Sequence, residues 1–146
     1  MRKLRPQSRD NSAGPRGQQT ALAILTAARD VLVEEGHPRL TMRNIAARAG
    51  MTVGNLSYYY ANKQDLLHDL IDAVIQGYVE EFDRISEDSG RSGEERLEEL
   101  MRFVISDLST PETTAFFPAL WALSIHDEFA AREMNDMYEI ERAVFY

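Results

Sequence analysis

Ten residues between positions 41 and 63 are of types suited to contacts with a DNA duplex, and their spacing places them on or beside two short helices. Asn55 can form two hydrogen bonds with adenine in the major groove, and Val53 can pack against the methyl group of thymine. Hydroxyl and basic groups commonly bind phosphates. The candidate DNA-binding residues are Thr41, Arg43, Thr52, Val53, Gly54, Asn55, Ser57, Tyr58, Tyr59 and Lys63.

Two helices joined by a tight turn would hold these side chains in place. Thr41 is suited to cap the first helix, and Gly50 is suited to end it. The apolar stripe of that helix consists of Met42, Ile45, Ala46 and Ala49. Thr52 caps a second helix that runs to about Tyr60, where Leu56 and Tyr60 face the core because they lie four residues apart. The pattern is typical of a helix-turn-helix, whose second helix enters the major groove.

Helical patterns also flank this region, and no stretch shows the alternation of a strand, so we predict an all-α fold. A first helix is predicted over 18–35 and is ended by Gly36. Asn62 is suited to cap a long helix that ends near Ser86, and Ser92 with Glu95 forms a capping box for the next one. Further helices follow Pro111 and Asp127. The apolar face predicted after the capping box consists of Leu97, Leu100, Met101, Val104, Ile105 and Leu108.

Residues 41–67 resemble the DNA-binding head of the TetR/AcrR family of bacterial transcriptional regulators. The matching positions are Thr41, Ile45-Ala46, Ala49-Gly50, Met51-Thr52, Leu56, Tyr58-Tyr59-Tyr60, Asn62-Lys63 and Leu66. The chain departs from the family at Ser57, where a tyrosine is usual. A direct base contact is therefore less expected at that position than at Asn55.

The resemblance implies a three-helix helix-turn-helix head, followed by a helical body that binds a ligand and dimerises. It implies a repressor that binds a palindromic operator in double-stranded DNA as a homodimer, and that a small apolar or aromatic effector releases. Because family dimers use two further C-terminal helices, we expect the body to be incomplete at Tyr146. The expected domains are a flexible basic arm over 1–17, the head over 18–62 and the regulatory body over 63–146.

The formal net charge of −8 is unevenly distributed along the chain. Residues 1–64 contain ten Lys or Arg and four Asp or Glu, whereas residues 65–146 contain six and twenty. A basic head can approach phosphates while an acidic body stays away from them. Acidic helices that simply face solvent would give the same composition, so this observation supports the DNA-binding interpretation without proving it.

Five residues of the body are candidate ligand contacts: Phe103, Phe117, Trp121, His126 and Tyr138. Phe103 lies off the main apolar stripe of its helix. Trp121 and His126 carry polar groups that need partners when buried. Aromatic side chains at helical spacing more often belong to an ordinary core, and that alternative stays open here.

Other function classes fit the sequence less well. The chain has no cysteine, and its three histidines are scattered, so we expect no catalytic residues, no metal site and no cofactor. Its longest apolar run is too short for a bilayer span, and we expect a cytoplasmic protein with no membrane partner. An architectural protein that binds DNA without sequence preference is the first alternative, and an enzyme on an all-helical scaffold is the second.

Overall fold

The computed structural model describes residues 14–145, and every regular element in that range is a helix. The predicted all-α fold is therefore confirmed. The helices are α1 (Pro15–Glu35), the short 3₁₀ helix η1 (His37–Arg39), α2 (Met42–Arg48), α3 (Val53–Tyr59), α4 (Lys63–Ser86), α5 (Gly93–Leu108), α6 (Pro111–Ser124) and α7 (Glu128–Phe145). None of the helices in the described range combines the length and the apolar character that crossing a membrane requires.

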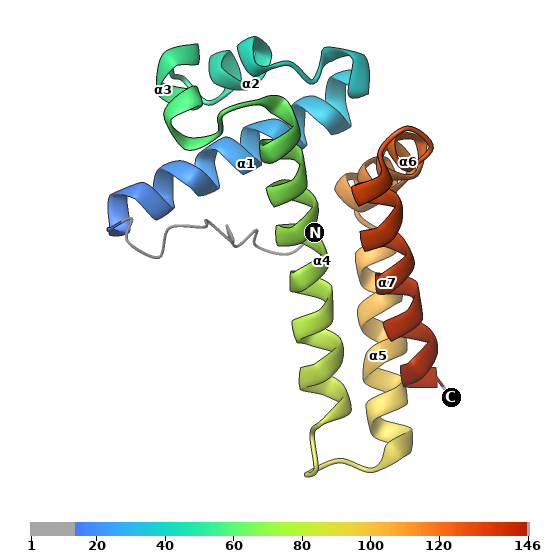
Figure 1. The fold of residues 1–146 in the computed structure, drawn as a ribbon. Coiled ribbons are helices and arrows are strands. Elements are labelled where there is room, and N and C mark those ends of the chain that lie inside the picture. The colour runs from blue at the N-terminus through green and yellow to red at the C-terminus, as the bar shows by residue number, and fades with distance from the viewer. Residues whose placement is uncertain (1–13, 146) are drawn as a thin grey trace.

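The helices form two parts, which we call the head (α1–α3) and the body (α4–α7). Figure 1 shows α2 and α3 side by side at one end of the molecule, with α1 beneath them. From there α4 leads away, and α5 and α7 run alongside it. The shorter α6 lies near the head, where it contacts α1 and α7. One long helix, α4, thus joins the head to the far end of the body.

Capping interactions begin the helices of the body where the sequence predicts them. The Asn62 side chain accepts a hydrogen bond from the Asp65 N–H at 2.9 Å, and α4 starts at the next residue. Ser92 and Glu95 form the predicted capping box: the Ser92 hydroxyl accepts from the Glu95 N–H, and the Glu95 carboxylate accepts from the Ser92 N–H. Such bonds satisfy backbone donors that have no partner within the helix.

The turn between α2 and α3 depends on Gly50, whose φ of +68° lies in the left-handed region. The Met51 N–H donates to the Ala46 carbonyl at 2.9 Å, and the Gly50 N–H donates to the Ala47 carbonyl at 3.2 Å. This pair of bonds is a Schellman motif, which ends a helix abruptly. It leaves only a few residues before α3 begins, as the sequence predicts.

The first helix begins earlier than predicted, at Pro15 instead of Gln18. Proline is well suited to the first turn of a helix because its φ is already helical and its missing N–H would have no partner there. The helix therefore includes the last three residues of the predicted arm. Gly14 of that arm precedes the helix as its N-cap, and residues 1–13 lie outside the described residues.

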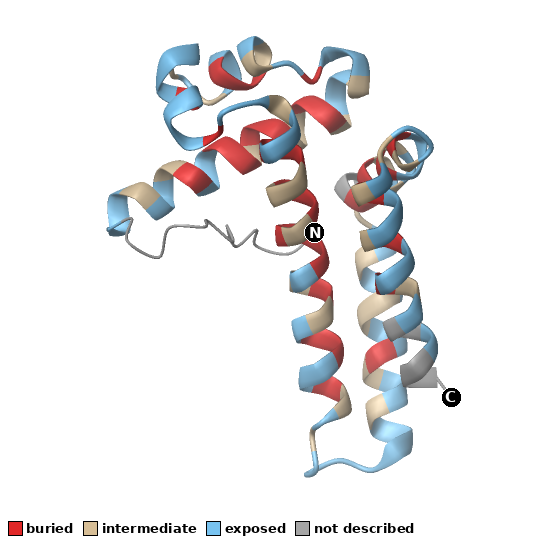
Figure 2. Ribbon diagram, viewed as in Figure 1, coloured by how far each residue is buried: buried red, intermediate tan, exposed pale blue. Residues whose placement is uncertain are grey.

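One apolar core runs through the head and along α4, and it fixes α3 against the rest of the molecule. Figure 2 shows buried residues along α1 and α4, whereas α3 is largely exposed. Tyr60 is buried just after α3, and its hydroxyl donates to the Asp69 carboxylate on α4 at 2.5 Å. Burial, together with this bond, raises the pKa of Tyr60 well above its ordinary value. The phenol therefore remains a neutral donor that ties the head to α4.

The predicted apolar face of α5 is wrong in part. Leu97, Met101, Ile105 and Leu108 are each about half exposed, whereas Leu100 is buried. The side of α5 that packs against α4 instead carries Leu100, Phe103, Val104 and Asp107. This second set also repeats at helical spacing. From the sequence alone, either face of α5 could be the buried one. The position of α4 determines which face is buried in the structure.

The junction between α4 and α7 is built around Asp127. The Asp127 carboxylate accepts a hydrogen bond from the Ala130 N–H at 2.9 Å and another from the side-chain amide of Gln64. The His68 ring nitrogen lies 3.6 Å from the same carboxylate, and the ring stacks on Phe129 with centroids 4.0 Å apart. The first turns of α4, next to the head, are thus bound to the start of α7.

We predict that Asp127 makes stability depend on pH. Burial opposes ionisation of this carboxyl, but the hydrogen bonds from Ala130 and Gln64 and the nearby His68 outweigh it, so the pKa lies below its ordinary value of 3.8. A pKa that is lower in the folded state stabilises the fold above pH 3.8, and this contribution is lost as the pH falls through the folded-state pKa. Asp127→Asn should therefore lower the free energy of unfolding by about 1 kcal/mol at neutral pH.

Urea unfolding at neutral pH and at about pH 3 would test this prediction. The difference between the wild type and Asp127→Asn should shrink at the lower pH, because the stabilisation by the charged carboxylate declines as the pH falls below 3.8 toward the folded-state pKa. Asp136→Asn removes an exposed carboxylate from the same helix and serves as the control, with a smaller effect expected. An equal difference at both pH values would show that the charge of Asp127 does not stabilise the fold.

Candidate nucleic-acid interface

The helix α3 presents almost its whole surface to solvent. It has seven residues, and only Leu56 among them is buried, with no exposed area. Tyr58 is 87% exposed and Val53 is 43% exposed, although both have large side chains. Exposed apolar and aromatic groups on a short, well-anchored helix are available for contact with another molecule. Five of the candidate DNA-binding residues, namely Val53, Gly54, Asn55, Ser57 and Tyr58, lie on α3 away from Leu56, and all are exposed.

Both predicted threonine caps are formed. The Thr41 hydroxyl oxygen accepts from the Asn44 N–H at 3.1 Å, and the Thr52 hydroxyl oxygen accepts from the Asn55 N–H at 3.2 Å. Both threonines are exposed, so each hydroxyl group can also donate to a phosphate oxygen. The Thr52 bond fixes the start of α3 and with it the backbone from which the Asn55 side chain projects.

The basic side chains of the head fall into two groups. Three arginines are neutralised within the head: Arg29 pairs with Asp30, Arg39 with Glu35 and Arg48 with Glu34. Across the described range, by contrast, no carboxylate forms an ion pair with Arg43 or Lys63. Both cations that were predicted to contact DNA are therefore available for an external anion.

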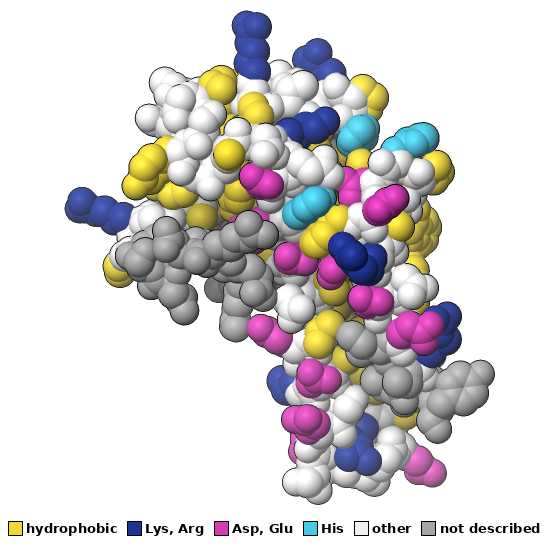
Figure 3. Space-filling model, in the orientation of Figure 1, with side chains coloured by type: hydrophobic (Ala, Val, Ile, Leu, Met, Phe, Trp, Pro, Cys, Tyr) yellow, Lys and Arg dark blue, Asp and Glu magenta, His cyan; other side chains and the backbone are white. Residues whose placement is uncertain are grey.

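Arg43 and Lys63 also lie where a cation is unfavourable for the helix itself. Arg43 is in the first turn of α2, and Lys63 is the first residue of α4. A positive charge at the positive end of a helix is unfavourable, but it adds to the local field that attracts phosphates. Figure 3 shows Lys and Arg side chains projecting from the head, whereas Asp and Glu gather along the body. The regional charge difference is thus visible on the surface.

The two exposed tyrosines at the end of α3 contact each other. The Tyr58 and Tyr59 rings meet edge to face, with centroids 5.5 Å apart. Tyr59 is 37% exposed and lies closer to the protein, while Tyr58 projects fully into solvent. Ser57 is exposed beside them, and its short side chain leaves space next to Tyr58. These residues form one continuous surface with the exposed side of α3.

A second feature is a cavity of about 230 Å³ inside the body. It brings together four of the five predicted ligand contacts, which are Phe103, Phe117, Trp121 and Tyr138. The Trp121 Nε1–H donates to the Tyr138 hydroxyl at 2.7 Å across the wall of the cavity. His126 does not line it: this residue is exposed after α6, because the chain turns there toward α7. The other lining residues are Tyr78, Phe82, Val104, Asp107, Leu108, Thr113 and Met137.

Sequence reasoning missed Asp107, the charged residue in the wall of this cavity. Its carboxylate accepts hydrogen bonds from the Tyr78 hydroxyl on α4 at 2.5 Å and from the Thr113 hydroxyl on α6 at 3.0 Å. Three helices thus meet at one carboxylate. The available signal was the four-residue spacing from Phe103, which puts both side chains on the same face of α5. This spacing does not by itself predict a cavity, because the position of α4 must also be known.

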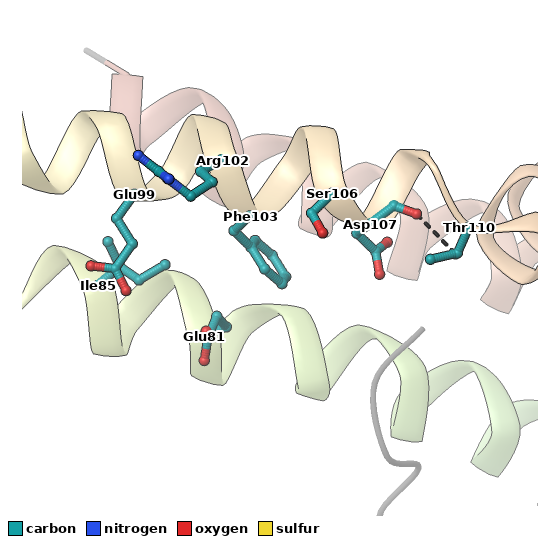
Figure 4. Close-up of a pocket in the computed structure, with 8 residues that line it drawn as sticks. All are labelled: Glu81, Ile85, Glu99, Arg102, Phe103, Ser106, Asp107 and Thr110. Atoms are coloured by element: carbon teal, nitrogen blue, oxygen red, sulfur yellow. Dashed lines mark hydrogen bonds between the residues drawn. The ribbon is translucent and has the colours of Figure 1, made fainter.

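An open groove of about 420 Å³ lies beside the cavity, between α4 and α5. Figure 4 shows Phe103 and Asp107 pointing from α5 toward α4, and both residues line the groove as well as the cavity. The other groove residues are Glu81, Ile85, Glu99, Arg102, Ser106 and Thr110. Arg102 is exposed and pairs with Glu98. The groove therefore opens the polar side of the cavity wall to solvent.

Part of the chain matches a known family of regulatory proteins. Residues 24–70, which include α2 and α3, match the family of bacterial regulatory proteins called the tetR family. Over 119 residues the chain is 29% identical to the uncharacterized HTH-type transcriptional regulator in the dhlA 5′ region of Xanthobacter autotrophicus. That alignment covers 79% of this chain and 58% of the relative. The chain thus spans a little over half the length of this curated relative.

Solved structures share the fold over most of the chain. A TetR transcription regulator from Haloarcula marismortui has a TM-score of 0.73 and 21% identity, covering 86% of this chain and 66% of that one. A structure from Mesorhizobium loti has a TM-score of 0.76 and 17% identity, covering 90% and 66%. These likenesses show a common fold. Together with the match over the head and the curated relative, they support a regulator of the TetR family.

Proposed function

We propose that the protein is a sequence-specific DNA-binding regulator of transcription, and that it acts as a ligand-responsive repressor in the cytoplasm. The observation that carries this proposal is the exposed side of α3, flanked by Arg43 and Lys63, which form no ion pair with the described residues. Basic groups bind phosphates and position a protein on a duplex, while groups on the helix between them contact base edges. The family match covers the same region.

In the proposed complex, α3 enters the major groove. Asn55 lies in its first turn and would form two hydrogen bonds with an adenine, while Val53 would contact a thymine methyl group. Gly54 has no side chain, which would let the backbone approach the groove closely. Tyr58, Tyr59, Thr41 and Thr52 would contact phosphates on either side. A homodimer would hold two copies of α3 about 34–36 Å apart, which matches two half-sites of an inverted repeat.

The cavity in the body would provide the response to an effector. Tyr78 lies on α4, the helix that begins at the head, and donates to Asp107 in the cavity wall. A ligand that prefers one position of α4 would shift the population toward one spacing of the two α3 helices. The coupling free energy between an effector site and a DNA-binding site is typically about 1–3 kcal/mol. The effector would thereby weaken operator binding.

We predict that Asn55→Ala lowers affinity for the operator by about 1–3 kcal/mol without changing affinity for unrelated DNA. The operator would first be found by selecting genomic fragments that bind the purified protein and sequencing them. Affinity would then be measured by fluorescence anisotropy for the operator and for a scrambled duplex. The reason for the difference is that Asn55 would contact a base, whereas phosphate contacts are the same in every sequence.

Asn135→Ala is the matched control, because Asn135 is also an exposed asparagine within a helix but lies on α7 in the body. It should leave both affinities unchanged. If no fragment is enriched, or if Asn55→Ala weakens binding to both duplexes equally, the proposal of sequence-specific recognition is wrong. Equal binding of all duplexes by the wild type would favour an architectural DNA-binding protein instead.

A further inference from the structure

The wall of the body cavity combines aromatic rings with one charged group. Asp107 is the single charged residue among the described residues that line it. Tyr78 lies at the centre of a ring cluster, with its centroid 5.5 Å from that of Phe117 and 6.0 Å from that of Phe103. The faces of such rings attract cations, and a carboxylate does so more strongly. The aromatic rings and the carboxylate therefore both favour a positively charged ligand.

We propose that the ligand of this cavity is a compact amphipathic cation, with an apolar ring or short chain among the aromatic side chains and an ammonium group against Asp107. This inference rests on the proposed function in assigning the cavity to an effector. A neutral apolar ligand would bury the carboxylate further and offer it neither a donor nor an opposite charge, which is costly. An anion would be repelled by it. The volume of about 230 Å³ is small for a ligand pocket, so the ligand is compact.

The groove between α4 and α5 provides a route by which a cation reaches Asp107. Its walls carry Glu81 and Glu99 as well as the shared residues Phe103 and Asp107, as Figure 4 shows. Arg84 pairs with both Glu81 and Glu99, and Arg91 also pairs with Glu99, so most of this charge is neutralised. The body as a whole is strongly acidic, and an acidic surface raises the local concentration of cations. Entry from the groove would bring the ammonium group to the Asp107 side first.

A test uses three ligands that share a phenyl ring and differ in charge: phenethylammonium, phenethyl alcohol and phenylpropanoate. The chain has one tryptophan, Trp121, which lines the cavity, so its fluorescence reports binding without a label. For the wild-type chain without DNA, we expect phenethylammonium to bind about tenfold more tightly than the alcohol, a difference of about 1.4 kcal/mol. Phenylpropanoate should bind more weakly than the alcohol.

Asp107→Asn tests whether this carboxylate determines the order of affinity of the three ligands. Asparagine keeps an acceptor for the Tyr78 and Thr113 hydroxyls, so the three helices remain joined. The variant should lose the tenfold preference for the cation while it still binds the alcohol. Asp83→Asn removes an exposed carboxylate from α4 and should keep the preference. Circular dichroism would establish that both variants are folded.

The outcomes separate the ligand class from the proposed function. The proposal is overturned if the wild type binds the alcohol or phenylpropanoate as tightly as phenethylammonium, or if none of the three changes Trp121 fluorescence. It is also overturned if Asp107→Asn keeps the cation preference. If the cation binds as expected but leaves operator affinity unchanged, the ligand class is supported and the proposed effector response fails. Operator affinity is measured separately, so the two failures cannot be confused.

Discussion

Leu56→Ala should destabilise the protein by about 3 kcal/mol and abolish operator binding at micromolar protein concentration. Leu56 has no exposed area and is the only buried residue within α3. A seven-residue helix is not stable by itself in water, so α3 depends on this contact with the core. Removal of most of the side chain leaves a cavity beneath the helix. Urea unfolding would measure the loss of stability, and fluorescence anisotropy would measure DNA binding.

Val53→Ala is the control for Leu56→Ala on the same helix. Val53 is 43% exposed, so its truncation should change the free energy of unfolding by less than about 0.5 kcal/mol. It should weaken operator binding only through the loss of its own contact with DNA. If both variants had equal stability, Leu56 would not hold α3 against the core, and the packing described for the head would be wrong.

The double variant Arg43→Ala/Lys63→Ala should bind DNA at least about a hundredfold more weakly, because a hydrogen bond to a charged group contributes about 1.5–3 kcal/mol. The loss should be similar for the operator and for unrelated DNA, since phosphates carry no sequence information. The plot of log K against log salt concentration should also become shallower by about 2, one for each lost phosphate contact. Titrations at several salt concentrations would measure both effects.

Arg39→Ala/Arg48→Ala is the matched control, since it removes the same charge from the head. These two arginines pair with Glu35 and Glu34, so their loss should weaken DNA binding less and leave the salt dependence closer to that of the wild type. The Arg43→Ala/Lys63→Ala variant should be no less stable than the wild type, because it removes cations from the positive ends of α2 and α4. Equal effects of both double variants would show that only net charge matters.

Features that depend on neighbouring residues in the chain could be predicted from the sequence. The caps at Thr41, Thr52 and Asn62 and the glycine turn at Gly50 each involve residues no more than five positions apart. Their energies are local, so the residue types at those positions suffice to place the start of α2, α3 and α4. The head could therefore be predicted almost completely, and so could the exposure of the α3 residues proposed to contact DNA.

The paired state of the arginines could not be predicted in the same way. Arg48 on α2 reaches Glu34 on α1 only because the two helices cross in the folded head. The sequence indicates which side chains are basic, but not which of them are already neutralised. The distinction between the paired arginines and the available Arg43 and Lys63 comes from the tertiary structure.

By itself, the sequence determined the long helices, most of their ends and the surface of α3, because hydrogen bonds within a few residues decide them. Only the tertiary structure decided which face of α5 is covered and that Asp107 lies in the wall of an aromatic cavity. The α5 sequence carries large apolar side chains on both faces, and apolar periodicity alone favours the face that stays half exposed. The choice depends on contacts with other helices: Tyr78 on α4 reaches Asp107 from 29 residues away, and Thr113 reaches it from the start of α6.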